Sequence, residues 1–127
     1  MLVVENLVKK YGRFKAVDGL SFTIEEGHIF GFVGANGAGK TTTMKIIAGL
    51  LEATSGRVTV DGLDVAENPR EVKSRIGYMP DFFGVYDDLK VIEYMDFYAG
   101  VYGIPPRERE KIADQLIELV NLSDKKY

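Results

Sequence analysis

The pattern of apolar and polar positions predicts three strands near the start of the chain. Residues 2–8 read LVVENLV, and the lysines and glycine of residues 9–12 predict a turn after them. Residues 20–24 read LSFTI, an alternation that is typical of a half-exposed antiparallel strand. Residues 29–33 read IFGFV without alternation, which predicts a strand buried on both faces of a parallel sheet. We therefore expect two kinds of sheet.

Helical periodicity begins at Thr41, and a glycine at position 49 suits the end of that helix. Its apolar positions are Met44, Ile47, Ala48 and Leu51. The segments 57–60 and 63–65 flank the dipeptide DG and predict a β-hairpin. Pro69 favours the first turn of a short helix, and a short strand over residues 75–80 is expected next.

An acidic and aromatic loop is predicted over residues 81–89, and two helices follow it. The first has its apolar stripe at Val91, Tyr94, Met95, Tyr98 and Tyr102, and it stops at a glycine and a proline. This stripe is either part of a core or a docking face for a partner. The last helix has its predicted apolar face at Ile112, Leu116, Leu119 and Val120.

A glycine-rich motif lies between the strand at 29–33 and the helix after it. Residues 34–41 read GANGAGKT and fit the spacing G-x-x-x-x-G-K-[ST] of a phosphate-binding loop. Its glycines let backbone N–H groups converge on phosphate oxygens, and the helix N-terminus favours negative charge. We expect Lys40 to act as the catalytic cation at the β- and γ-phosphates and Thr41 to offer its hydroxyl to Mg²⁺. The residues expected to bind the nucleotide phosphates are Asn36, Gly37, Ala38, Gly39, Lys40, Thr41 and Thr42.

Other nucleotide sites fit the sequence less well. A dinucleotide fingerprint wants glycine or alanine where Thr42 stands. A GTPase would carry the sequence Asn-Lys-x-Asp for guanine, which does not occur here, and a small nucleotide kinase would not need a strand containing Tyr11 ahead of its loop. Tyr11 itself is either an ordinary aromatic at a strand end or a platform on which a base stacks.

Composition narrows the classes of function. With 127 residues the chain has the length of one domain, and a net charge of −3 argues against a protein that coats nucleic acid. The sequence has no cysteine, so disulfides and cysteine-bound metals are excluded. Its apolar runs are far shorter than the ~20 residues of a membrane span. The one histidine, His28, is expected to be a turn residue.

Together these pieces resemble the nucleotide-binding domain of ATP-binding cassette (ABC) transporters over essentially all of the chain. The resemblance implies that Tyr11 stacks on adenine and that residues 31–43 are the Walker A segment. It also implies an α/β fold: a P-loop core of parallel sheet flanked by helices, an N-terminal antiparallel β subdomain, and the start of a helical subdomain. We expect the boundary between residues 1–80 and residues 81–127.

Within that family, residues 29–31 and the run TTTM at 41–44 look most like exporter ATPases. The implied ligands are ATP and Mg²⁺. The implied partners are a second nucleotide-binding domain arranged head-to-tail and a membrane-spanning permease, which would hold the protein at the cytoplasmic face of the cell membrane. No nucleic-acid partner is expected. The alternatives are a soluble ABC ATPase that acts on ribosomes or DNA, and a non-catalytic nucleotide-binding fragment.

The sequence departs from the family pattern in two places. Asp81 stands where the family carries a glutamine that contacts Mg²⁺, and it is either a metal ligand or an ordinary loop aspartate. The 127 residues also contain no LSGG signature, no Walker B strand and no switch histidine. We therefore expect an N-terminal part of a longer ATPase that binds nucleotide without turnover. An uncovered edge at residues 29–33 would favour self-association.

Overall fold

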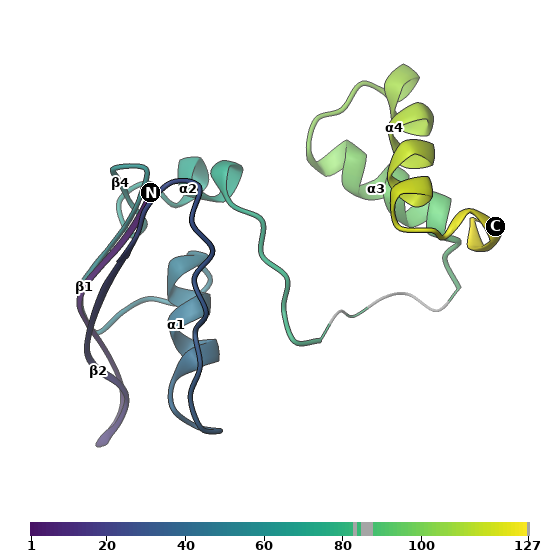
Figure 1. Cartoon of the computed structure of the whole chain (residues 1–127). Helices are drawn as coiled ribbons and strands as arrows, with labels where there is room; N and C mark the ends of the chain where they lie inside the picture. Colours follow the sequence, from purple (N-terminus) through teal and green to yellow (C-terminus); the bar gives the residue numbers. More distant parts are fainter. Residues whose placement is uncertain (83, 85–87, 127) are drawn as a thin grey trace. The chain divides into compact units, whose positions relative to one another are not determined.

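The computed structural model of the chain describes residues 1–82, 84 and 88–126. It divides into two compact units, Met1–Met79 and Pro80–Tyr127, which are described separately below (Figure 1). Residues 83 and 85–87 of the predicted acidic and aromatic loop lie outside the described residues.

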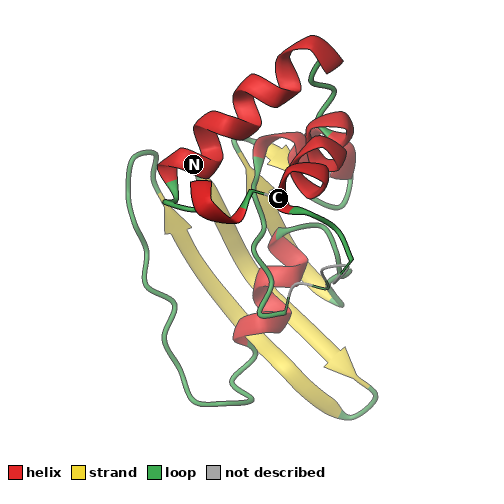
Figure 2. Ribbon diagram, turned by 90° about the vertical axis from the view of Figure 1, so that its right-hand side faces the viewer, coloured by secondary structure: helices red, strands yellow, loops and turns green. Residues whose placement is uncertain are grey.

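The first unit contains a four-stranded sheet with the order β2-β1-β3-β4, in which every pair is antiparallel. The strands are β1 (Leu2–Tyr11), β2 (Phe14–Ile24), β3 (Ser55–Val60) and β4 (Leu63–Asp64). Figure 2 shows β1 and β2 as a long hairpin. The prediction that residues 9–12 form a turn was wrong, because Lys9 and Lys10 pair with β2 and the strand continues to Tyr11.

The core of this unit lies between one face of the sheet and two helices, α1 (Lys40–Ile47) and α2 (Pro69–Arg75). In Figure 1, α1 runs alongside the sheet. The buried residues of this core are Val4, Leu7, Val17, Ile46, Val58, Val60, Val65 and Val72. Of the stripe predicted for α1 and its C-terminal end, Ala48 is buried, and Ile47 and Leu51 are partly buried and pack against this core. Met44 was wrong: it is 47% exposed, and Ile46 is the buried residue instead.

The predicted hairpin between β3 and β4 is present. Asp61 and Gly62 at its turn both have positive φ, 48° and 79°, as a two-residue type I′ turn requires. The backbone ammonium of Met1 lies 2.5 Å from the carboxylate of Asp61. This ion pair joins the residue just before β1 to the tip of the neighbouring hairpin.

The segment 29–33 is not a strand, which corrects the sequence prediction. Ile29 is fully exposed and Val33 is 95% exposed, while the rings of Phe30 and Phe32 pack at 5.2 Å and 5.8 Å from the ring of Phe22. Among the described residues no strand pairs with this segment, so only one of its two faces is covered. The short strand predicted over residues 75–80 is absent for the same reason, although Ile76 has an extended backbone.

The second unit contains α3 (Val91–Val101), α4 (Pro106–Leu119) and the short 3₁₀ helix η1 (Ser123–Lys125). Arg109 of α4 donates a hydrogen bond from Nε to the carbonyl of Ile104, 2.7 Å away, and its guanidinium lies against Gly100. The predicted apolar face of α4 was wrong except at Ile112, which is half-buried. Its buried residues are Ala113 and Ile117, while Leu116, Leu119 and Val120 are exposed.

On α3 the predicted stripe is only partly covered. The rings of Tyr94 and Tyr98 lie 4.8 Å apart, tilted by 52°, and the hydroxyl of Tyr94 donates a hydrogen bond of 3.3 Å to the hydroxyl of Tyr98. Tyr98 and Tyr102 nevertheless remain exposed, at 39% and 71%. The stripe is thus half-buried at Val91, Tyr94 and Met95 and exposed toward the end of the helix. In the described ranges, no helix is both long enough and apolar enough to cross a membrane.

Candidate phosphate-binding site

The loop that precedes α1 turns through two left-handed glycines. Gly37 has φ 82° and Gly39, the N-cap of α1, has φ 85° and ψ 8°. Side chains are strained in this region of backbone space, whereas glycine adopts it freely. The N–H of Ala38 donates to the carbonyl of Ala35 at 3.1 Å. The motif GANGAGKT is thus a tight turn that delivers the chain into the first turn of a helix.

Gly39 lies directly against β2. A Cβ placed on Gly39 would overlap the carbonyl oxygen of Ala16 and lie 3.2 Å from Cγ2 of Val17. This contact could not be predicted from local sequence, because Ala16 and Gly39 are far apart along the chain. It anchors the end of the loop to the antiparallel sheet.

Thr43 fixes the loop from inside the helix. Its side chain is buried, with 1% exposure, and its Oγ1 donates to the carbonyl of Gly39 at 2.9 Å. The backbone N–H of Thr43 donates to the same oxygen at 2.8 Å. Sequence reasoning missed this role; a threonine four residues after a loop glycine is the signal that points to it.

Lys40 spans the loop. Its Nζ donates to the carbonyl oxygens of Gly34 at 2.5 Å and Ala35 at 2.7 Å. An ammonium held by neutral carbonyls can exchange them for phosphate oxygens, with which its hydrogen bonds are charge-assisted. The first turn of a helix also leaves N–H groups without an intrahelical acceptor, and the first turn of α1, which is described throughout, carries no acidic residue. The residues present therefore fit a polyphosphate.

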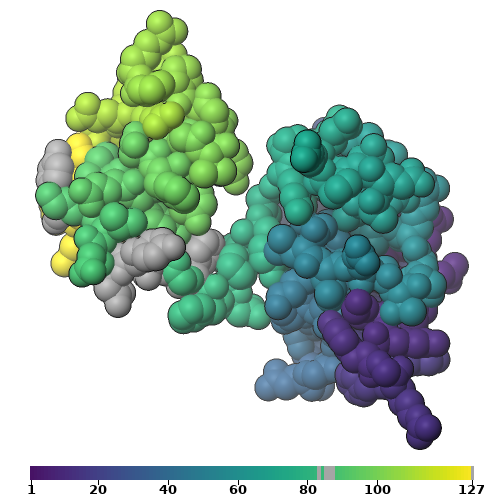
Figure 3. Space-filling view, turned by 180° about the vertical axis from the view of Figure 1, so that it is seen from behind, coloured from purple at the N-terminus to yellow at the C-terminus, as the bar shows by residue number. Residues whose placement is uncertain are grey.

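Tyr11 ends β1, opposite Phe14 of β2. Its side chain is 52% exposed, and Nζ of Lys9 lies 5.2 Å from the centroid of its ring. In Figure 3 the end of this hairpin and the start of α1 both lie at the lower edge of the first unit, and Figure 1 agrees. The base platform and the phosphate loop suggested by the sequence thus occupy the same end of this unit.

The remaining predicted residues are placed as follows. Asn36 and Thr41 are exposed and Thr42 is half-buried, all in the first unit. Asp81 is exposed and belongs to the second unit, so its role as a metal ligand with Thr41 stays a prediction. The described residues form no group of three or more acidic or histidine side chains that could hold a metal ion.

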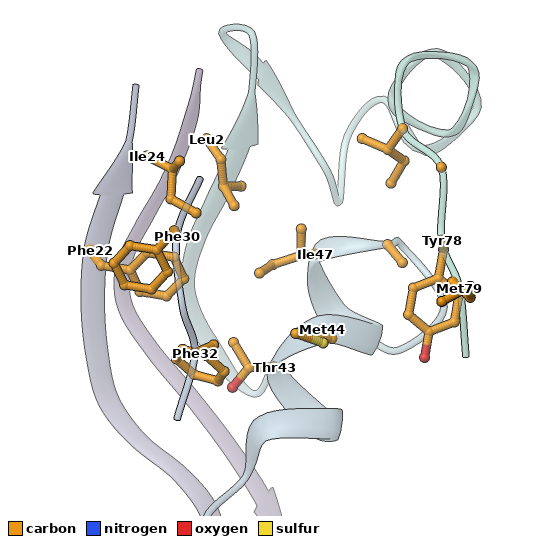
Figure 4. A pocket seen from close by; sticks show the side chains of 13 residues that line it. Leu2, Phe22, Ile24, Phe30, Phe32, Thr43, Met44, Ile47, Tyr78 and Met79 are labelled. Carbon is orange, nitrogen blue, oxygen red and sulfur yellow. The ribbon is translucent and has the colours of Figure 1, made fainter. Parts of the chain in front are cut away.

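An apolar pocket of about 320 Å³ lies elsewhere in the first unit (Figure 4). Its walls come from Phe22 of β2, from Phe30 and Phe32, from Met44 of α1, and from the extended segment 76–79. Its lining, which is wholly within the described part of the chain, includes no charged side chain. It is therefore unsuited to a triphosphate, and the phosphate loop remains the candidate site.

Comparison with known proteins decides the family. The sequence pattern of the family described as ABC transporter matches residues 17–127. The chain belongs to the ABC transporter family. Among the relatives, it is 41% identical over 114 residues to the probable multidrug ABC transporter ATP-binding protein YbhF of Escherichia coli, and 37% identical over 125 residues to the linearmycin resistance ATP-binding protein LnrL of Bacillus subtilis.

These alignments cover 89% and 98% of this chain, but only 20% of YbhF and 40% of LnrL. The chain therefore spans less than half the length of these ABC relatives. It also superimposes on a solved ATP-binding subunit of an ABC transporter with a TM-score of 0.83 and 28% identity, covering 99% of this chain and 52% of that one. The predicted α/β cassette fold with its antiparallel β subdomain is confirmed.

Proposed function

We propose that this chain is a nucleotide-binding part of the ATP-binding subunit of an ABC exporter. The observation that carries the proposal is the phosphate loop, with its two left-handed glycines and with Lys40 spanning it, at the head of a helix. The names of the relatives, one a multidrug transporter protein and one a linearmycin resistance protein, favour export of drug-like molecules. They favour a transporter over a soluble ATPase that acts on ribosomes or DNA.

Each residue of the site then has a distinct role. Tyr11 stacks on the adenine base, and the backbone N–H groups of Gly37 and of residues 39–42 bind the phosphates. Lys40 releases its two carbonyl partners and places its charge on the β- and γ-phosphates. The hydroxyl of Thr41 would hold Mg²⁺, which when bound neutralises charge between these two phosphates.

In the whole protein, two such domains would close head-to-tail on ATP, and a membrane-spanning permease would be the second partner. The protein would then work at the cytoplasmic face of the cell membrane. Phosphoryl transfer also needs a positioned water and a donor to the transition-state charge. The 127 residues contain neither the signature sequence nor a Walker B strand, so we propose that by themselves they bind nucleotide without turning it over.

Calorimetric titration of Mg-ATP into the chain tests the proposal. We expect saturable binding that Lys40→Ala weakens by about 10- to 100-fold, the loss that corresponds to a hydrogen bond from a charged group. The control is Lys45→Ala, which removes a lysine from the last turn of the same helix and should leave the affinity unchanged. Equal affinity in Lys40→Ala would contradict the site. Steady-state hydrolysis that disappears in Lys40→Ala would contradict binding without turnover.

A further inference from the structure

Lys9 links the ring of Tyr11 to the loop that follows α1. Its Nζ lies over the Tyr11 ring, 5.2 Å from the centroid, and donates a hydrogen bond of 2.7 Å to the carbonyl oxygen of Glu52. The loop is itself held on β1, because Thr54 donates from its N–H to the carbonyl of Val8 and accepts from the N–H of Lys10 at its hydroxyl. The ammonium of Lys9 therefore has a fixed place above the ring.

The register of the hairpin puts this arrangement on the side of the phosphate loop. Lys9 of β1 is the partner of Val17 of β2, and directly opposed residues carry their side chains on the same face of a sheet. Val17 is also the side chain that approaches Gly39 at the end of the loop. Lys9 and the ring beneath it thus share the sheet face that contacts the phosphate loop.

The two faces of the Tyr11 ring differ in their surroundings. Nζ of Lys9 lies over one face, and because the side chain is 52% exposed, part of the ring surface stays accessible to a ligand. A cation over an aromatic ring is attracted to its negative face and fixes the ring relative to the charge. The accessible face is then presented in a defined orientation, as stacking of a flat purine requires.

We propose that Lys9 is a positioning residue for the nucleotide base: it holds the Tyr11 ring so that its open face receives adenine. This inference rests on the proposed function, since it assumes that the phosphate loop binds a nucleotide. Lys9 acts on the base through Tyr11, because its ammonium is engaged by the ring and by the carbonyl of Glu52. Its removal should therefore affect ligands that carry a base and spare ligands made of phosphate alone.

Binding of Mg-ATP and of inorganic tripolyphosphate to the full chain, measured by calorimetry, separates these effects. Lys9→Met keeps the aliphatic stem and removes the charge. We expect it to weaken ATP binding by about two- to fivefold, in keeping with the strength of an exposed cation–π contact, and to leave tripolyphosphate binding unchanged. Lys9→Arg keeps a cation over the ring and should retain the affinity for ATP. The matched control is Lys10→Met, because the next side chain along the strand points to the other face.

Two results would overturn the inference in different ways. If the unaltered chain binds ATP and tripolyphosphate but Lys9→Met changes neither affinity, or weakens both equally, Lys9 does not position the base and the phosphate site stands. If the unaltered chain binds neither ligand, the proposed function fails and the role of Lys9 fails with it. A selective loss of ATP affinity in Lys9→Met that Lys9→Arg restores would support the proposal.

Discussion

The carbonyl oxygen of Ala16 on β2 lies against Gly39 so closely that no side chain fits at position 39. Gly39 also has a left-handed backbone, at φ 85°. Two separate constraints, one steric and one conformational, therefore act on the residue at which the phosphate loop becomes a helix. Through it, the antiparallel sheet determines where the loop ends.

The two left-handed glycines of the loop allow these constraints to be separated. Gly39→Ala should lower the free energy of unfolding by more than the roughly 1–2 kcal/mol of left-handed strain, because the backbone must also move away from β2. Gly37→Ala meets the same strain at φ 82°, but its Cβ would enter open space, so its loss should be smaller. Urea denaturation measures the free energy of unfolding of both variants. Equal losses would show that the contact with Ala16 has no energetic effect.

Thr43 offers a test of how the loop is held from the helix side. Thr43→Val keeps the volume but removes the hydrogen bond from Oγ1 to the carbonyl of Gly39. That carbonyl keeps its bond from the backbone N–H, so we expect a loss of about 0.5–1.5 kcal/mol in the free energy of unfolding. Thr23→Val, on the exposed side of β2, is the control and should change stability by less than about 0.5 kcal/mol. A neutral Thr43→Val would show that the hydroxyl does not stabilise the loop.

The carboxylate of Asp64 should contribute to stability in a pH-dependent way. Its partial burial raises the pKa, but hydrogen bonds from Arg57 and from the backbone N–H groups of Ala66 and Glu67 outweigh this and hold the pKa below its ordinary value. Because the pKa is lower in the folded than in the unfolded state, the contribution is complete above the unfolded pKa of about 3.9 and is lost as the pH falls through the folded value.

Asp64→Asn should therefore flatten the acid limb of the stability curve below about pH 4, as measured by urea denaturation at several pH values. The control is Asp18→Asn, which removes an exposed carboxylate paired with Lys15 at 3.0 Å and should leave the acid limb nearly unchanged. If Asp64→Asn keeps the same steepness as the unaltered chain, the depressed pKa of Asp64 does not govern the acid response.

The exposed segment 29–33 should make the chain self-associate. Ile29 and Val33 present almost their entire side chains to solvent, and unpaired extended backbone with apolar side chains favours pairing with another chain. We expect the mass measured by light scattering to rise with concentration, and the double variant Ile29→Lys, Val33→Lys to remain monomeric. Leu119→Lys changes an exposed apolar residue of α4 and should not alter the association. A mass that stays monomeric at every concentration would contradict the prediction.

Local signals in the sequence were sufficient for the elements that depend on near neighbours. The strand-independent glycine turn before α1, the helix α1 itself and the turn at Asp61 and Gly62 were predicted correctly, because their glycines and their spacing act over a few residues. The same reasoning failed for residues 29–33. Burial of a strand depends on partners elsewhere in the protein, and here only the side of Phe30 and Phe32 finds one.

The buried face of α4 also depends on partners that the local sequence does not specify. The apolar residues predicted to face inward included Ile112 and Leu116, whereas Ala113 and Ile117, one position further along the helix, are buried. A stripe of apolar residues fixes the period of a helix, but the neighbouring helix decides which edge of the stripe is covered. The contacts of Gly39 with Ala16 and of Lys9 with Glu52 likewise join residues far apart in the sequence, so no local pattern predicts them.

The ion pair between the Met1 ammonium and Asp61 has a practical consequence for preparing the protein. A purification tag fused ahead of Met1 would convert that ammonium into a neutral amide and place its linker beside the tip of the β3–β4 hairpin. The pKa of Asp61, which the ammonium lowers through its hydrogen bond and its charge, would then move back toward its ordinary value. A tag that is cleaved so that Met1 is free would preserve the ion pair with Asp61.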